Sequence, residues 1–326
     1  MTCPVRVFLA VLVMALVAAS RAVLSQGYPI KPIRVASNAS AGSPGDVAIR
    51  LMAAKMSGAL GQPVVVEIRP GAGGAIAASD VIRSEADGYS ILYTTGILIV
   101  SKFLMKTMTV DVLRDFVPIS LVATVNLYLI VHESVQAKSV QELVSYAKRN
   151  PGKLSYATNG VGSGLHLFGV SFSQSTGADV FHVPYGSGNN ALRLNDFLEG
   201  RVSIVFAPYD FIKPNLAGGK IRVLAITDDK RTKHMPDIPA ITESFPNYML
   251  TPGFFGLLGR TGLPQPIVAR LEGEAQKALL DPNVVSKLDA IGVDSVGSSA
   301  QSFGSILRNQ VEVIGSLIKA AGLTPQ

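Results

Sequence analysis

The sequence has a single cysteine, Cys3, no tryptophan and only four histidines among its 326 residues. Cys3 precedes the apolar run at residues 7–19, so an exported chain that loses this run would contain no cysteine. Disulfides, thiol chemistry and cysteine-bound metals are therefore excluded from the expected mature protein. The histidines lack the H-x-x-x-H spacing with a nearby carboxylate that would indicate a metal site, so we expect none.

The N-terminal segment has the pattern of a secretory signal peptide. Arg6 supplies a positive charge, residues 7–19 are all apolar, and Ser20, Arg21 and Ala22 follow them. We predict a signal peptide at residues 1–22, cleaved near Ala22, and a periplasmic location for the mature protein. The apolar run is shorter than the roughly 20 residues that a membrane span needs; a retained membrane anchor is the alternative.

Charge is sparse and evenly spread. The formal net charge is +6, and the lysines and arginines are scattered rather than clustered. No basic helix or aromatic-interleaved patch indicates a nucleic-acid partner. The mild positive charge would help to steer a carboxylate inwards, although a soluble basic surface explains it equally.

Catalytic patterns are also missing. Ser163 and Ser187 lack the G-x-S-x-G frame of a hydrolase nucleophile, and no paired carboxylates indicate acid–base catalysis. The glycine run at residues 69–74 has neither G-x-G-x-x-G nor a Gly-Lys-Ser/Thr ending, which argues against a nucleotide site. We therefore expect a protein that is not an enzyme and has no cofactor.

The most informative stretch present is residues 33–60, where a short apolar run leads through a loop of small residues into an amphipathic helix. Pro44 suits the first helical position, and Asp46 can receive first-turn amides. A ligand could approach the unpaired N–H groups of that turn, where the helix dipole favours an anion. An ordinary tight β-α turn is the alternative interpretation.

The same arrangement occurs again at residues 154–165: a strand, a glycine-rich loop and a helix. His166 falls in the first turn of that helix, where packing and ligand contact are equally good explanations of it. Two such loops in different halves of the chain could face one another across a cleft and hold a small acid. Strand and helix alternate throughout, which indicates a largely parallel sheet, and β-like segments near Thr124 and Pro252 would link two hinged domains.

Seven short motifs in a fixed order resemble those of one family. They are the motifs at residues 28–34, 60–67, 69–74, 87–89, 150–154, 182–185 and 255–258, the last ahead of Gly262-Leu263-Pro264. The mature chain resembles the solute-binding receptors of the tripartite tricarboxylate transporters, also called Bug receptors. The resemblance implies an α/β, two-domain periplasmic-binding-protein fold (type II-like), with a hinge and an interdomain ligand cleft. We expect domain 1 at residues 23–125 plus 253–326 and domain 2 at residues 126–252.

The resemblance, together with the two loops, indicates a set of ligand-binding residues. The expected set is Ser40, Ala41, Gly42, Ser43, Asp46, Thr94, Thr95, Asn159, Gly160, Ser163, His166 and Tyr185. The chain departs from the family pattern inside this set. The first loop reads Ala-Gly-Ser-Pro-Gly-Asp instead of Pro-Gly-Gly-Gly-Thr-Asp, no lysine follows Tyr185, and Ala207 stands where many relatives have a polar residue. These departures affect the identity of the ligand more than the fold.

The function implied is capture of a small organic carboxylate by hinge closure, for delivery to the membrane permease subunits of a tripartite transporter. We expect a monomer without catalytic residues, cofactor or metal. Two alternatives stay open: a ligand-responsive protein that feeds a sensor kinase, and an exported hydrolase using Ser163 and His166.

Overall fold

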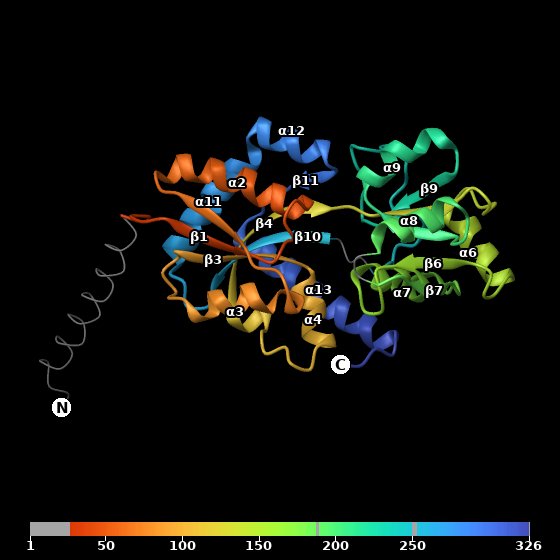
Figure 1. Cartoon of the computed structure of the whole chain (residues 1–326), viewed down its shortest axis with the longest axis horizontal. Coiled ribbons are helices and arrows are strands. Elements are labelled where there is room, and N and C mark those ends of the chain that lie inside the picture. Colours follow the sequence, from red (N-terminus) through yellow and green to blue (C-terminus); the bar gives the residue numbers. More distant parts are fainter. Residues whose placement is uncertain (1–26, 187–188, 250–252, 326) are drawn as a thin grey trace, which may run out of the picture.

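The computed structural model describes residues 27–186, 189–249 and 253–325. The chain forms two α/β units, each built around its own sheet (Figure 1). The predicted signal peptide at residues 1–22 and the serine at position 187 lie outside the described residues. No helix within the described ranges is both long and apolar enough to cross a membrane.

The sheet of the first unit has six strands in the order β11-β4-β10-β3-β1-β2. They are β1 (Ile33–Ser37), β2 (Val64–Ile68), β3 (Ser90–Thr95), β4 (Phe116–Val125), β10 (Gly253–Arg260) and β11 (Val293–Ser295). Strand β1 pairs in parallel with both β2 and β3, whereas β10 runs antiparallel to β3 and β4. In this sheet the expected parallel pairing is thus found only on the β3-β1-β2 side.

Helices cover both faces of this sheet. They are α2 (Pro44–Leu60), α3 (Ala75–Arg83), α4 (Ile97–Leu104), α5 (Val112–Asp115), α11 (Gln265–Leu280), α12 (Pro282–Ala290), α13 (Ala300–Ala320) and the 3₁₀ turn η1 (Ala72–Gly74). Helices α2, α11 and α12 share one core with the sheet, and α3, α4 and α13 share the other (Figure 1). Burial of these two apolar cores is the main source of stability in this unit.

The second unit has a five-stranded sheet in the order β7-β6-β8-β5-β9. Its strands are β5 (Tyr128–His132), β6 (Ser155–Thr158), β7 (Phe181–Pro184), β8 (Ile204–Ala207) and β9 (Ile221–Ile226). In this second sheet β6 pairs in parallel with β7 and β8. Its helices are α6 (Val140–Arg149), α7 (Gly164–Thr176), α8 (Asn190–Leu198), α9 (Tyr209–Asn215), α10 (Ile241–Ser244) and the 3₁₀ turn η2 (Leu216–Gly218). One face packs on α6, α7 and α10, and the other on α8 and α9.

The chain passes between the units where β-like segments were expected. Strand β4 ends at Val125 in the first sheet, and β5 begins at Tyr128 in the second. The return to the first sheet is complete where β10 begins, at Gly253. The division into two domains at residues 125 and 252 stays a prediction, because two hinged domains must move relative to one another.

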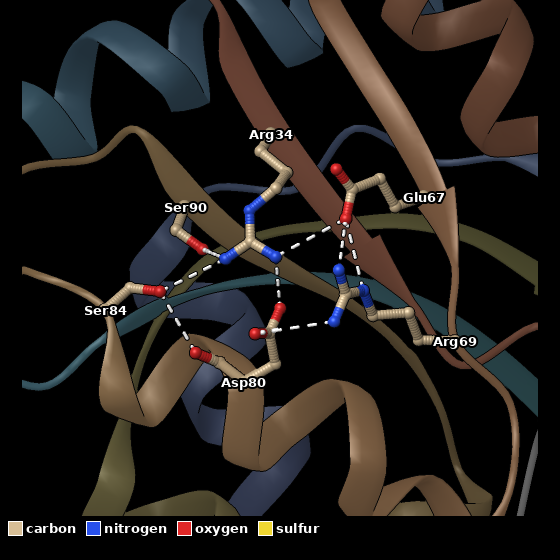
Figure 2. A network of polar contacts seen from close by, with 6 residues as sticks. All are labelled: Arg34, Glu67, Arg69, Asp80, Ser84 and Ser90. Carbon is tan, nitrogen blue, oxygen red and sulfur yellow. Dashed lines mark hydrogen bonds and ion pairs between the residues drawn. The ribbon is translucent and has the colours of Figure 1, made fainter.

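A polar network fastens α3 to the first sheet (Figure 2). The Arg34 guanidinium on β1 pairs with Asp80 of α3, lies 3.4 Å from Glu67 Oε2 on β2, and donates to Ser90 Oγ at 2.7 Å. Arg69 donates to the same Glu67 oxygen at 2.8 Å. Arg34 is the second residue of β1, so this network lies away from the end of the strand that leads into α2.

Candidate functional site

A cavity of about 880 Å³ lies between the two units. Both predicted loops reach it: Ser40 and Ser43 line it from the loop before α2, and Asn159 and Ser163 from the loop before α7. Thr95, at the end of β3, is a third predicted contributor. The structure therefore brings five of the predicted residues together around one cavity, although they come from distant parts of the chain.

The loop before α2 is held by its own side chains. Ser43 is the N-cap, and its Oγ accepts from the Asp46 N–H at 3.3 Å. Asp46 in turn accepts from the Gly42 N–H at 2.9 Å and pairs with Arg50 at 2.7 Å. The buried Asp46 carboxylate thus fixes the loop, and neither Asp46 nor Gly42 lines the cavity.

The loop before α7 repeats this scheme. Ser163 is the N-cap and accepts from the His166 N–H at 3.2 Å, while His166 Nδ1 accepts from the Gly162 N–H at 3.0 Å. Gly42 and Gly162 have φ angles of 74° and 76°, a left-handed conformation that glycine adopts readily. Both loops therefore follow one pattern, in which a glycine amide is held by the side chain four residues later.

This pattern leaves first-turn amides available to a ligand. The N–H of Gly45 in α2, and those of Gly164 and Leu165 in α7, have no carbonyl partner within their helices. Pro44 has no N–H, so α2 offers one donor fewer than α7. Gly45 and Gly164 both line the cavity, which places two positive helix ends beside it.

His166 lies behind the second loop in a stack of rings. Its ring lies 4.0 Å from that of His182, with an interplanar angle of 12°, and Tyr156 stacks on His182 at 5.1 Å. Burial lowers the pKa of His166, and burial together with the neighbouring His166 lowers the pKa of His182 to about 4. His166 is not a lining residue, so its contact with a ligand stays a prediction.

Four other predicted residues do not line the cavity either: Ala41, Thr94, Gly160 and Tyr185. Thr94 is buried and accepts from Asn38 Nδ2 at 3.0 Å, while the Thr95 N–H donates to Asn38 Oδ1 at 3.1 Å. The Tyr185 hydroxyl donates to Asp196 at 2.7 Å. Burial, and to a lesser extent this hydrogen bond, raises the pKa of Tyr185 to about 12.

Sequence reasoning missed most of the cavity wall. Asn38 lines it, as do apolar side chains of α4 and α13 and of the start of β10: Ile97, Val100, Leu104, Ile314, Phe254 and Phe255. The wall combines segments more than 200 residues apart, and no local motif signals such a combination. None of the described residues that line the cavity carries a charge.

One group of side chains could in principle share a metal ion. His234, Asp289 and Asp294 bring ligand atoms within 4.8 Å of one another. Lys233 Nζ, however, lies 2.6 Å from Asp289 Oδ1 and 3.8 Å from Asp294 Oδ1. The ammonium group already pairs with both carboxylates, so we interpret the four residues as an ion-pair cluster that connects the loop after β9 to α12 and β11.

A model of the tripartite tricarboxylate transporter family receptor matches residues 48–323. The chain belongs to this receptor family. It is 32% identical over 302 residues to a UPF0065 protein of Bordetella bronchiseptica, covering 92% of this chain and 89% of the relative. The family predicted from the sequence is thus confirmed.

Two solved structures of related proteins have the same fold as this receptor. A protein of R. palustris, solved with adipate, has 32% identity and a TM-score of 0.73, with 92% of this chain and 100% of the other covered. The periplasmic binding protein BugD has 30% identity and a TM-score of 0.69, with the same coverage. The predicted α/β fold of a periplasmic binding protein, with two sheets, is confirmed.

Proposed function

We propose that this receptor captures a small organic carboxylate in the cavity between its two units and delivers it to membrane permease subunits of a tripartite transporter. The observation that carries the proposal is the pair of helix N-termini, α2 and α7, which meet at one cavity from opposite units. The related R. palustris structure contains adipate, itself a carboxylate.

The chemistry of the cavity suits an anion held by neutral donors. With no charged side chain among the described lining residues, binding would depend on main-chain amides and on the helix dipoles. Each charge-assisted hydrogen bond contributes roughly 1.5–3 kcal/mol once water is displaced. Closure of the two units would displace that water, which favours a hinge between residues 23–125 plus 253–326 and residues 126–252.

Location and assembly complete the proposal. Receptors of this family act in the periplasm, and we propose cleavage of the signal peptide near Ala22 and a monomeric mature protein. A role in feeding a sensor kinase uses the same cleft and stays the alternative. The hydrolase alternative is disfavoured because, in the described structure, no hydrogen bond joins the Ser163 hydroxyl to the His166 ring: Ser163 Oγ accepts from the His166 N–H, and His166 Nδ1 accepts from the Gly162 N–H.

Calorimetric titration of the mature protein against mono-, di- and tricarboxylates tests this function. We expect Asn159→Phe, which fills the cavity from the second loop, to abolish binding with little change in the melting temperature. Ser163→Phe should abolish binding and also remove a helix cap, at a cost of about 1 kcal/mol. Ser139→Phe is the matched control, because Ser139 caps α6 in the same way but does not line the cavity. Unchanged affinity in both cavity variants would refute the site.

A further inference from the structure

The cavity has two chemically different parts. The helix ends of α2 and α7 supply amides to its lining, whereas α4, α13 and the start of β10 supply apolar side chains. Ile97 of α4 is 50% exposed and Val161 is 60% exposed, although both line the cavity. Large exposed apolar side chains among the lining of a cavity favour an apolar ligand there.

The apolar part begins directly beside the amides. A Cβ atom on Gly162 would come within 2.5 Å of Leu104 Cδ1, so the end of α4 touches the second loop. Leu167 and Phe168 continue the apolar surface along α7 on the side of the second unit. A molecule whose carboxylate sits at the helix ends would therefore place its next atoms against hydrocarbon.

The polar groups within the apolar part are few and neutral. Ser101 of α4 is 4% exposed, and Gln310 of α13 is 3% exposed; both line the cavity. A second carboxylate placed here would lose its hydration without gaining a cation, and burying such a charge costs several kcal/mol. A neutral substituent of the ligand, such as a hydroxyl group, could form a hydrogen bond with the Gln310 side-chain amide.

We infer that the natural ligand is a monocarboxylate with a bulky apolar body, such as an aromatic ring or a medium-length alkyl chain. This inference rests on the proposed function and names the ligand class for the same cavity. The volume of about 880 Å³ agrees with it. This volume lies within the roughly 300–1,000 Å³ of pockets that hold drug-sized ligands, so the cavity has room for a bulky body.

The test compares acids that differ only in the second carboxylate. Hexanoate against adipate, and benzoate against terephthalate, are titrated calorimetrically into the ligand-free mature protein. We expect the monocarboxylate of each pair to bind at least tenfold more tightly. Tighter binding of the diacids would overturn the inference but leave the proposed function intact, whereas binding of no carboxylate would overturn both.

A charge introduced into the apolar part provides a second test. Leu104→Arg places a cation at the C-terminal end of α4, where the helix dipole tolerates it, and should shift the adipate-to-hexanoate affinity ratio at least tenfold towards adipate. Leu113→Arg, on exposed surface of α5 outside the cavity, is the control and should leave the ratio unchanged. An unchanged ratio in Leu104→Arg would show that the ligand body lies elsewhere.

Discussion

Stability at mildly acidic pH should depend on His182, the middle ring of the stack behind the second loop. Its Nε2 lies 2.6 Å from Thr158 Oγ1, and its ring faces His166 at 4.0 Å. Burial and the neighbouring His166 lower the pKa of His182 to about 4 in the folded protein. In the unfolded chain the imidazole recovers an ordinary pKa of about 6.5.

The sign follows from which state binds the proton. Between pH 6.5 and 4 the unfolded chain takes up a proton at His182 and the folded protein does not, so the free energy of unfolding falls as the pH falls. Each pKa unit corresponds to about 1.4 kcal/mol. Because the ring is partly exposed, we discount the full shift and expect a loss of about 2 kcal/mol between pH 7.5 and 4.5.

Urea unfolding at these two pH values measures the loss. His182→Gln keeps a partner for Thr158 but cannot titrate, so it should lose about 2 kcal/mol less stability than the parent. Asp228 works in the opposite direction, because burial raises its pKa to about 6 and the folded protein takes up that proton first. An Asp228→Asn control separates the two effects. An equal loss in His182→Gln and the parent would refute the argument that burial keeps this ring neutral.

Three further changes test the packing and the ion pairs. Gly256→Ala puts a Cβ 2.1 Å from Phe303 Cζ, and urea titration should show a loss of about 1–3 kcal/mol from overpacking between β10 and α13. Lys233→Met breaks the partly exposed pair with Asp289; the expected loss of about 0.2–1 kcal/mol should disappear when the melts are repeated near 1 M salt. Asp80→Asn removes one carboxylate from the network of Figure 2, and chemical denaturation should show a loss of about 1–3 kcal/mol, with no change in carboxylate affinity.

The sequence was informative where structure is local. Pro44 at the first turn of α2 and the loop before α7 are both decided by residues within one turn of each other, and the structure shows each as predicted. The β-like segment expected near Thr124 is the place where the chain leaves the first sheet, since β4 ends at Val125 and β5 begins at Tyr128.

The apolar wall of the cavity was not predictable in this way. Helix α4 begins with Ile97-Leu98-Ile99-Val100, four apolar residues that fit a buried strand as well as a helix. Gln310 and Ile314 reach the cavity only because α13 packs beside α4 and α7, a contact between distant segments. His166 and Asp46 were predicted near the ligand, but their hydrogen bonds turn them towards the glycine amides of their own loops.

The cavity uses main-chain groups for one part of the ligand and side chains for the rest, and this affects how such a receptor can acquire new ligands. The acid group would be held by main-chain amides of α2 and α7, which most side-chain substitutions leave in place, whereas the remainder of the cavity is built from side chains of α4, α13 and β10. Substitutions in those three elements can therefore redirect the receptor to a different acid while its hold on the carboxylate persists. A designer of biosensors could vary the three elements as an exchangeable library on a constant anion-binding frame.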